Sequence, residues 1–207
     1  MSYSFTRKTD NFNKVMAVDV NELQIAVEAI SATVDTMSSI NATFLLSAAG
    51  ITPAVTNGCA DQEKKTSSSN LVTYKIAAFD ASTVEIGWFN HPLPSDYDGG
   101  TILYRVYWEH PATTTNFKVA FNLAAVAIAD DGAIDTAVGS TVQVNDTGGT
   151  TNDLYITPWS TALTIAGTPT YNKMVYWRLQ RVANDATNDT LAVDAWVKYV
   201  EITYTRA

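Results

Sequence analysis

The sequence predicts a mainly β protein, whose body is a jelly-roll-like antiparallel β-sandwich preceded by an N-terminal arm and one short helix. Apolar and polar residues alternate in short segments through residues 71–207, as they do in half-buried strands. Clusters of Asp, Asn and Gly separate these segments and are typical of turns. Residues 19–38 instead show a helical spacing of apolar residues. Two packed sheets are favoured because each strand has one apolar face and the sequence offers no long helix to cover it.

Residues 1–18 are expected to form an arm that anchors the chain to a partner. The whole chain has 21 Asp and Glu against 13 Lys and Arg, whereas this segment has three basic residues against Asp10 alone. A basic segment on an acidic protein is steered toward a surface of complementary charge. The residues expected to make the anchoring contacts are Tyr3, Phe5, Arg7, Lys8, Phe12 and Lys14.

Residues 19–38 are expected to form a helix with a heptad pattern. Asp19 and Glu22 have the spacing of a capping box, with Asp in the place of Ser or Thr. Apolar residues recur at alternating steps of three and four, which places them at the a and d positions of a heptad. This seam consists of Met16, Val20, Leu23, Val27, Ile30, Val34 and Met37. Either the helix packs on its own domain or the seam joins identical chains, and this segment alone leaves the stoichiometry open.

Residues 39–70 are expected to be a linker between the helix and the β-sandwich. Thr52-Pro53 and Asn57-Gly58 are turn signals, and the polar run 62–70 has the composition of a flexible connection. The domain boundary is therefore expected near residue 70.

The body, residues 71–207, is expected to consist of short strands rich in aromatic and β-branched residues. In the final run the apolar residues change from one face to the other between Val197 and Val200, which predicts a bulge or a bend. The alternating segments are Tyr74–Ala78, Val84–Trp88, Ile102–Trp108, Phe117–Leu123, Val142–Val144, Leu154–Ile156, Leu163–Ile165, Val175–Leu179 and Leu191–Tyr204.

The tryptophans divide into two expected groups. Three of them share the apolar phase of their strands and are expected in the core: Trp88, Trp108 and Trp177. Tyr107, Trp159 and Trp196 lie off that phase or in loops. We therefore expect these three residues on an exposed or interfacial surface that could recognise a ligand.

The sequence offers little to support catalysis or a cofactor. The single cysteine, Cys59, excludes an intramolecular disulfide and a cysteine-based metal site. No nucleotide-binding or hydrolase motif is present, so we expect no enzyme, no catalytic or metal-binding residue and no cofactor. Acidic turns such as Asp130-Asp131-Gly132 either bind Ca²⁺ through their oxygens or only form turns, and the residues leave this open.

Charge and hydropathy exclude further classes of partner. A formal net charge of −8 disfavours binding to nucleic acid or to an anionic membrane surface. No apolar run reaches the length of about 18 residues that a membrane span needs. The N-terminus lacks the basic start and apolar core of a signal peptide, so we expect a chain that is made in a cytoplasm and not secreted.

Several stretches of the body resemble a β-sandwich protein family that is common in tailed-bacteriophage genomes. Together they cover most of residues 71–207, whereas residues 1–70 do not take part in the resemblance. The stretches are Pro94–Trp108 (PSDYDGGTILYRVYW), Ala127–Asp146 (AIADDGAIDTAVGSTVQVND), Leu154–Pro169 (LYITPWSTALTIAGTP) and Asn188–Tyr204 (NDTLAVDAWVKYVEITY).

The resemblance implies a structural virion protein, either a capsid decoration (cement) protein or a head-fibre or tail-fibre-like protein. Its first implication is a homotrimer that binds and stabilises the phage head. In this assembly the arm would contact the major capsid protein or another virion protein, and the helices would meet around a threefold axis. The alternative is a fibre module that recognises a host surface glycan. In both cases the protein would be made in the bacterial host cytoplasm and reside in the virion.

Overall fold

The computed structural model describes the chain over residues 20–30, 41–111, 117–171 and 173–207. The chain divides into two compact units, residues 1–40 and residues 41–207. In the first unit residues 20–30 form a helix, inside the helical range that the sequence predicts. No helix among the described residues is long and apolar enough to cross a membrane.

Several predictions for the first unit lie outside the described residues. They concern the anchoring arm, residues 1–18, and the parts of the helix prediction that fall on Asp19 and on residues 31–38. Three residues of the predicted seam also lie outside the described residues: Met16, Val34 and Met37. The other four seam residues, Val20, Leu23, Val27 and Ile30, belong to the described helix and are exposed.

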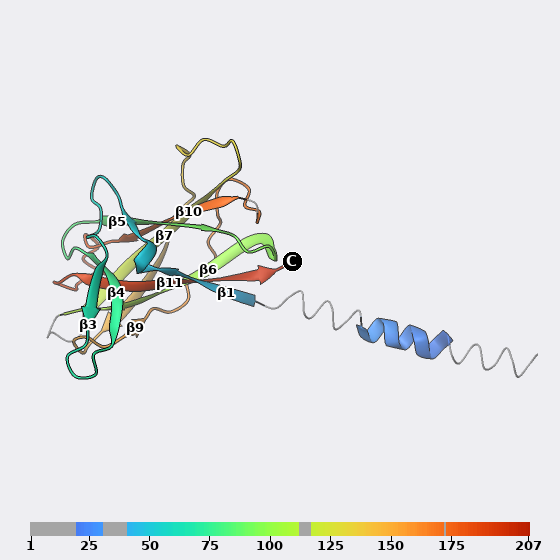
Figure 1. The fold of residues 1–207 in the computed structure, drawn as a ribbon, viewed down its shortest axis with the longest axis horizontal. Coiled ribbons are helices and arrows are strands. Elements are labelled where there is room, and N and C mark those ends of the chain that lie inside the picture. Colours follow the sequence, from blue (N-terminus) through green and yellow to red (C-terminus); the bar gives the residue numbers. More distant parts are fainter. Residues whose placement is uncertain (1–19, 31–40, 112–116, 172) are drawn as a thin grey trace, which may run out of the picture. The chain divides into compact units, whose positions relative to one another are not determined.

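The second unit is built from two antiparallel sheets (Figure 1). A short 3-10 helix, η1 (Ala48–Gly50), follows the first strand. The strands are β1 (Asn41–Ser47), β2 (Thr52–Pro53), β3 (Glu63–Thr66), β4 (Thr73–Phe79), β5 (Glu85–Pro92), β6 (Tyr97–Glu109), β7 (Phe117–Ile128), β8 (Val142–Gly148), β9 (Tyr155–Ile156), β10 (Met174–Arg181) and β11 (Ala195–Arg206).

The strand order is that of a jelly roll, as the sequence predicts. One sheet has the order β3-β4-β11-β6-β9, with β1 also paired to β11, and the other has the order β2-β5-β10-β7-β8. From β4 onward each connection crosses from one sheet to the other, except the one from β7 to β8. This alternation is the double-sheet arrangement of jelly rolls, and it confirms the predicted fold class.

Residues 41–66 differ from the linker expected over 39–70, because they supply three strands. β1 pairs with β11 from Asn41 opposite Thr205 to Ser47 opposite Tyr199. Leu46, Ala48 and Ile51 are buried in the core, which anchors this segment. The polar run that resembles a flexible connection contains β3, an edge strand whose charged side chains keep the sheet edge soluble. The structured body therefore begins at Asn41.

The C-terminal strand contains the irregularity that its sequence predicts. The pairing of β11 with β6 shifts register between Val197 and Tyr199. Val197 and Val200 are both buried, so the shift lets the strand present apolar residues to the core on both sides of it.

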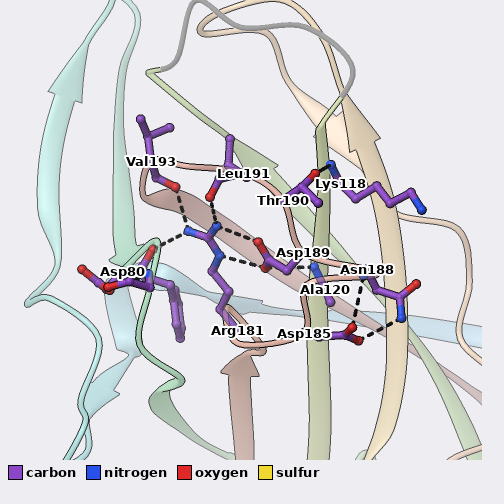
Figure 2. Close-up of polar contacts among 12 residues, drawn as sticks. Asp80, Lys118, Ala120, Arg181, Asp185, Asn188, Asp189, Thr190, Leu191 and Val193 are labelled. Atoms are coloured by element: carbon purple, nitrogen blue, oxygen red, sulfur yellow. Dashed lines mark hydrogen bonds and ion pairs between the residues drawn. The ribbon is translucent and has the colours of Figure 1, made fainter.

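A fully buried ion pair lies at the end of β10 (Figure 2). Arg181 Nε donates to Asp189 Oδ2 at 3.0 Å, and Nη2 donates to Asp189 Oδ1 at 2.8 Å. The remaining guanidinium N–H groups donate to the carbonyl oxygens of Phe79, Leu191 and Val193. All five donors of the guanidinium are thus satisfied, as a buried arginine requires.

The same pair joins four parts of the chain. Asp189 Oδ2 also accepts a hydrogen bond from the Ala120 backbone N–H at 3.2 Å. The pair therefore connects β4 through Phe79, β7 through Ala120, β10 through Arg181 and the segment that leads into β11.

Replacing Arg181 with Met should destabilise the fold strongly, because Asp189 would remain buried without its partner. We expect a loss of about 3–5 kcal/mol in the free energy of unfolding. Urea unfolding followed by tryptophan fluorescence measures it. The matched control is Arg206→Met, which breaks the exposed ion pair between Arg206 and Asp96 and should cost at most about 1 kcal/mol. Equal losses in the two variants would show that the buried ion pair contributes no more to the free energy of unfolding than the exposed pair does.

Candidate functional site

The outer face of the β2-β5-β10-β7-β8 sheet carries an aromatic surface. Trp88 in β5 and Tyr176 in β10 alternate with buried neighbours and are themselves only partly buried. In the register of β5 and β10, Trp88 lies opposite Arg178 and Asn90 lies opposite Tyr176. Because opposite residues share a face of a sheet, these four side chains lie together on the side away from the core.

A groove of about 620 Å³ runs over this face, and we call it the β5–β10 groove. Its volume lies within the range of about 300–1,000 Å³ that is usual for ligand sites. A second cavity of about 530 Å³ shares Ile134 and Tyr176 with it and extends toward Tyr171. The groove is lined by Thr52, Trp88, Asn90, Val126, Ile134, Asp135, Thr136 and Tyr176.

The segment between β7 and β8 forms one wall of the groove. Asp131 has a φ of 57°, in the left-handed region that Asp tolerates better than most residues. A Cβ on the next residue, Gly132, would lie 2.9 Å from the Ala129 carbonyl oxygen, so the turn needs a glycine there. Gly139 N–H donates to the Ala125 carbonyl of β7 at 3.1 Å, which anchors the far end of the segment.

The groove combines aromatic rings with polar side chains that are free to bind a ligand. Asn90 and Asp135 are exposed and make no side-chain hydrogen bond or ion pair within the described part of the chain. The same holds for the Tyr176 hydroxyl among those residues. Thr136 is already engaged, because its hydroxyl donates to the Ala133 carbonyl at 2.6 Å. The arrangement suits a ligand with one apolar face and several hydroxyl groups.

The position of Trp88 corrects the sequence prediction, which placed it in the core with Trp108 and Trp177. Trp108 and Trp177 are fully buried, but the residues of β5 that face the core are Gly87 and Phe89. A Cβ at Gly87 would collide with the Ile51 side chain, so the glycine marks a close approach in the core. Since Ile86, Trp88 and Phe89 are all apolar, hydropathy alone does not decide which phase faces inward.

The residues predicted for surface recognition, Tyr107, Trp159 and Trp196, belong to the opposite sheet or to the loop beside it. Tyr107 and Trp159 both flank Arg105, whose Cζ lies 5.4 Å from the Tyr107 ring centroid and 4.4 Å from that of Trp159. Trp159 is 39% exposed, whereas Tyr107 is partly buried. The cation already occupies one approach to each ring.

The polar groups around Arg105 are bound to one another. Arg105 Nε donates to Glu201 Oε2 at 2.7 Å, and the Tyr107 hydroxyl donates to the same oxygen at 2.6 Å. Burial opposes ionisation of Glu201, but these two donors outweigh it and lower the pKa of the carboxyl group. This cluster therefore leaves fewer free polar groups for a ligand than the β5–β10 groove does.

Trp196 lies at a separate cavity of about 660 Å³ on the same sheet. Lys65 Nζ lies 4.3 Å from its ring centroid. In the floor of the cavity, Lys198 and the Tyr74 hydroxyl both contact Glu109 at 2.8 Å. Burial and the Glu109 carboxylate raise the pKa of Tyr74 to about 12. The charged groups of this cavity are thus paired internally, and the function of Trp196 in recognition remains a prediction.

Comparison with known proteins identifies similar folds but no family. No protein-family model matches the chain, and no curated protein matches it. The CBM22-2 xylan-binding domain of Paenibacillus barcinonensis Xyn10C is 12% identical and has a TM-score of 0.48, with 78% of this chain and 99% of that domain covered.

Two larger structures are also similar. The CBM22-1-GH10 modules of Clostridium thermocellum xylanase 10B, solved with xylohexaose, are 13% identical with a TM-score of 0.46, and the match covers 81% of this chain. This chain spans only 28% of that structure. A structure of infectious bursal disease virus strain Gx is 9% identical with a TM-score of 0.35, and 80% of this chain and 32% of that chain are covered.

Two tryptophans on neighbouring strands test the assignment of the two faces. Trp177→Ala removes a fully buried ring and should cost about 3–5 kcal/mol in the free energy of unfolding. Trp88→Ala removes a partly exposed ring from the groove and should cost less than about 2 kcal/mol, because no core cavity forms. Chemical denaturation of both variants measures the difference, and a larger loss for Trp88→Ala would contradict the assigned register.

Proposed function

We propose that this chain is a non-catalytic glycan-recognition module that binds saccharides in the β5–β10 groove. The observation that carries the proposal is the pair of aromatic side chains, Trp88 and Tyr176, on one sheet face beside the unengaged polar groups of Asn90 and Asp135.

The chemistry of a saccharide matches both kinds of group. The C–H groups on one face of a sugar ring are apolar and pack against an aromatic ring, which excludes water from both. The hydroxyl groups at the edge of the ring both donate and accept hydrogen bonds. Asn90 offers an amide that does the same, and Asp135 offers a carboxylate that accepts two hydroxyl donors. A mainly apolar groove with a few convergent polar groups is the usual form of a ligand site.

The proposal does not include hydrolysis of the glycan, a reaction that normally uses two carboxyl groups on opposite sides of the scissile bond. Asp135 is the single carboxylate among the described residues that line the groove. Cys59 is no alternative nucleophile, since burial raises the pKa of its thiol to about 12 and keeps it protonated at neutral pH.

Replacing Trp88 with Ala should weaken glycan binding by about tenfold or more, the loss expected for a central aromatic contact. A glycan array with the labelled full chain identifies a ligand, and isothermal titration with that ligand measures the affinity. The control is Trp159→Ala, which removes a more exposed tryptophan from outside the groove and should leave the affinity within about twofold. The reverse result would move the site to the Arg105 cluster.

We further propose that copies of the chain associate through the heptad seam of the N-terminal helix, with the trimer as the expected assembly. The four described seam residues are exposed to between 56% and 65%. An isolated helical segment of fewer than about 12–15 residues is marginal in water, so residues 20–30 would be stabilised by a packed partner. A seam with heptad spacing fits another helix with the same spacing. Glu22 and Glu28 occupy heptad positions away from the seam, so identical acidic helices can meet without repulsion.

The setting we propose for this assembly is the tailed-phage virion, on the basis of the sequence resemblance. A trimer with three grooves would bind a repetitive host-surface glycan with high avidity, even where each groove binds weakly. The role in capsid decoration and the contact of residues 1–18 with a capsid protein remain predictions, because the arm lies outside the described residues.

A charge in the seam should dissociate the assembly. Leu23→Asp places a carboxylate at a d position and should convert the full chain to monomers in light scattering after size exclusion. The control is Ile25→Asp, which introduces the same charge at an equally exposed position of the same helix outside the seam and should leave the assembly intact. A monomeric unmodified chain, or a Leu23→Asp variant that still assembles, would overturn the proposed interface.

A further inference from the structure

Arg178 belongs to the sheet face that carries the β5–β10 groove, although it is not among the residues that line the groove. It lies directly opposite Trp88 and two residues after Tyr176, so its side chain leaves β10 on the side that carries both groove aromatics. The side chain is partly buried.

Arg178 differs from the other described arginines in having no carboxylate partner. Arg105, Arg181 and Arg206 each contact a carboxylate oxygen at 3.0 Å or less. For Arg178 no ion pair is found within the described part of the chain, and its Nε is buried without a hydrogen-bond partner there. Burial accordingly lowers the pKa of this guanidinium.

A neighbouring group on the same face is also unsatisfied. Asn122 in β7 lies opposite Gln180, which follows Arg178 by two residues in β10 and so shares its face. The Oδ1 atom of Asn122 is buried without a hydrogen-bond partner among the described residues. Buried polar atoms are normally paired with protein groups or with ordered water. Both atoms belong to the outer face of this sheet, and Arg178 is the nearer of the two to the groove residue Trp88.

A carboxylate is the anion whose shape matches the guanidinium of Arg178. A guanidinium binds a carboxylate through two parallel hydrogen bonds, and this pairing is strong when it is shielded from water. Among the described residues that line the groove, Asp135 on the β7–β8 segment is the one charged side chain, and it is not bound to Arg178. A negatively charged ligand would therefore be oriented, with its acidic group toward Arg178 and away from Asp135.

We propose that the groove takes an acidic glycan, and that Arg178 binds a carboxylate of its uronic-acid units. This proposal rests on the glycan recognition proposed above and names the class of saccharide. The aromatic residues hold the sugar rings, and Arg178 provides the discrimination between charged and neutral chains.

The test compares matched acidic and neutral saccharides on the full chain. The probes are oligogalacturonate, alginate and hyaluronan oligosaccharides, each beside its methyl-esterified form, together with sulfated and neutral oligosaccharides. We expect at least one carboxylated form to bind at least tenfold more tightly than its ester. Arg178→Gln should remove that difference while leaving the affinity for the ester within about twofold. Arg206→Gln, which alters an exposed arginine, should preserve the difference.

The outcomes separate this proposal from the proposed function. Trp88-dependent binding of neutral saccharides, with no loss in Arg178→Gln, would overturn the acidic specificity and leave glycan recognition intact. Equal losses for acid and ester in Arg178→Gln would show a structural role, which overturns the proposal. Arg178-dependent binding of sulfated chains alone would overturn the assignment to a carboxylate. Binding to no saccharide would overturn both proposals.

Discussion

Arg181 ends strand β10 with its guanidinium buried between the two sheets, bound to Asp189 and to backbone carbonyls from three other positions. Side chains alternate along a strand, so an inward Arg181 fixes Trp177 inward and Tyr176 and Arg178 outward. A slip of one residue would bury the groove side chains and expose the core. The buried pair thus fixes which face of β10 is available to a ligand.

The two outer faces of the sandwich differ in how completely their polar groups are satisfied. On the β6–β11 side, Arg105, Tyr107 and Glu201 bind one another, and Glu109 is held by Tyr74 and Lys198. On the β5–β10 side, no ion pair or side-chain hydrogen bond joins Asn90, Asp135 and Arg178 to one another within the described part of the chain. Internal pairing stabilises a surface, whereas unpaired groups beside an aromatic groove leave binding capacity for a ligand. This contrast is the physical basis for assigning recognition to the β5–β10 groove.

Alternation along the chain predicts the two-sheet body and the irregularity in β11, because both depend on local patterns. It does not predict β3, since the charges of an edge strand resemble those of a linker. It also misplaces Trp88, because Ile86, Trp88 and Phe89 are all apolar and the close approach at Gly87 becomes visible only in the packed structure. The lack of a carboxylate partner for Arg178 depends on contacts between distant strands, which the sequence does not reveal.

Hydrogen–deuterium exchange of the full chain, measured with and without a saccharide identified by glycan screening, tests the location of the binding site most directly. The proposed site predicts slower exchange on binding in the wall segment between β7 and β8, residues 129–141, because a ligand in the groove contacts Ile134, Asp135 and Thr136. Exchange in residues 157–162, around Trp159, should remain unchanged. Protection confined to residues 157–162, with none in the wall segment, would contradict the proposed site.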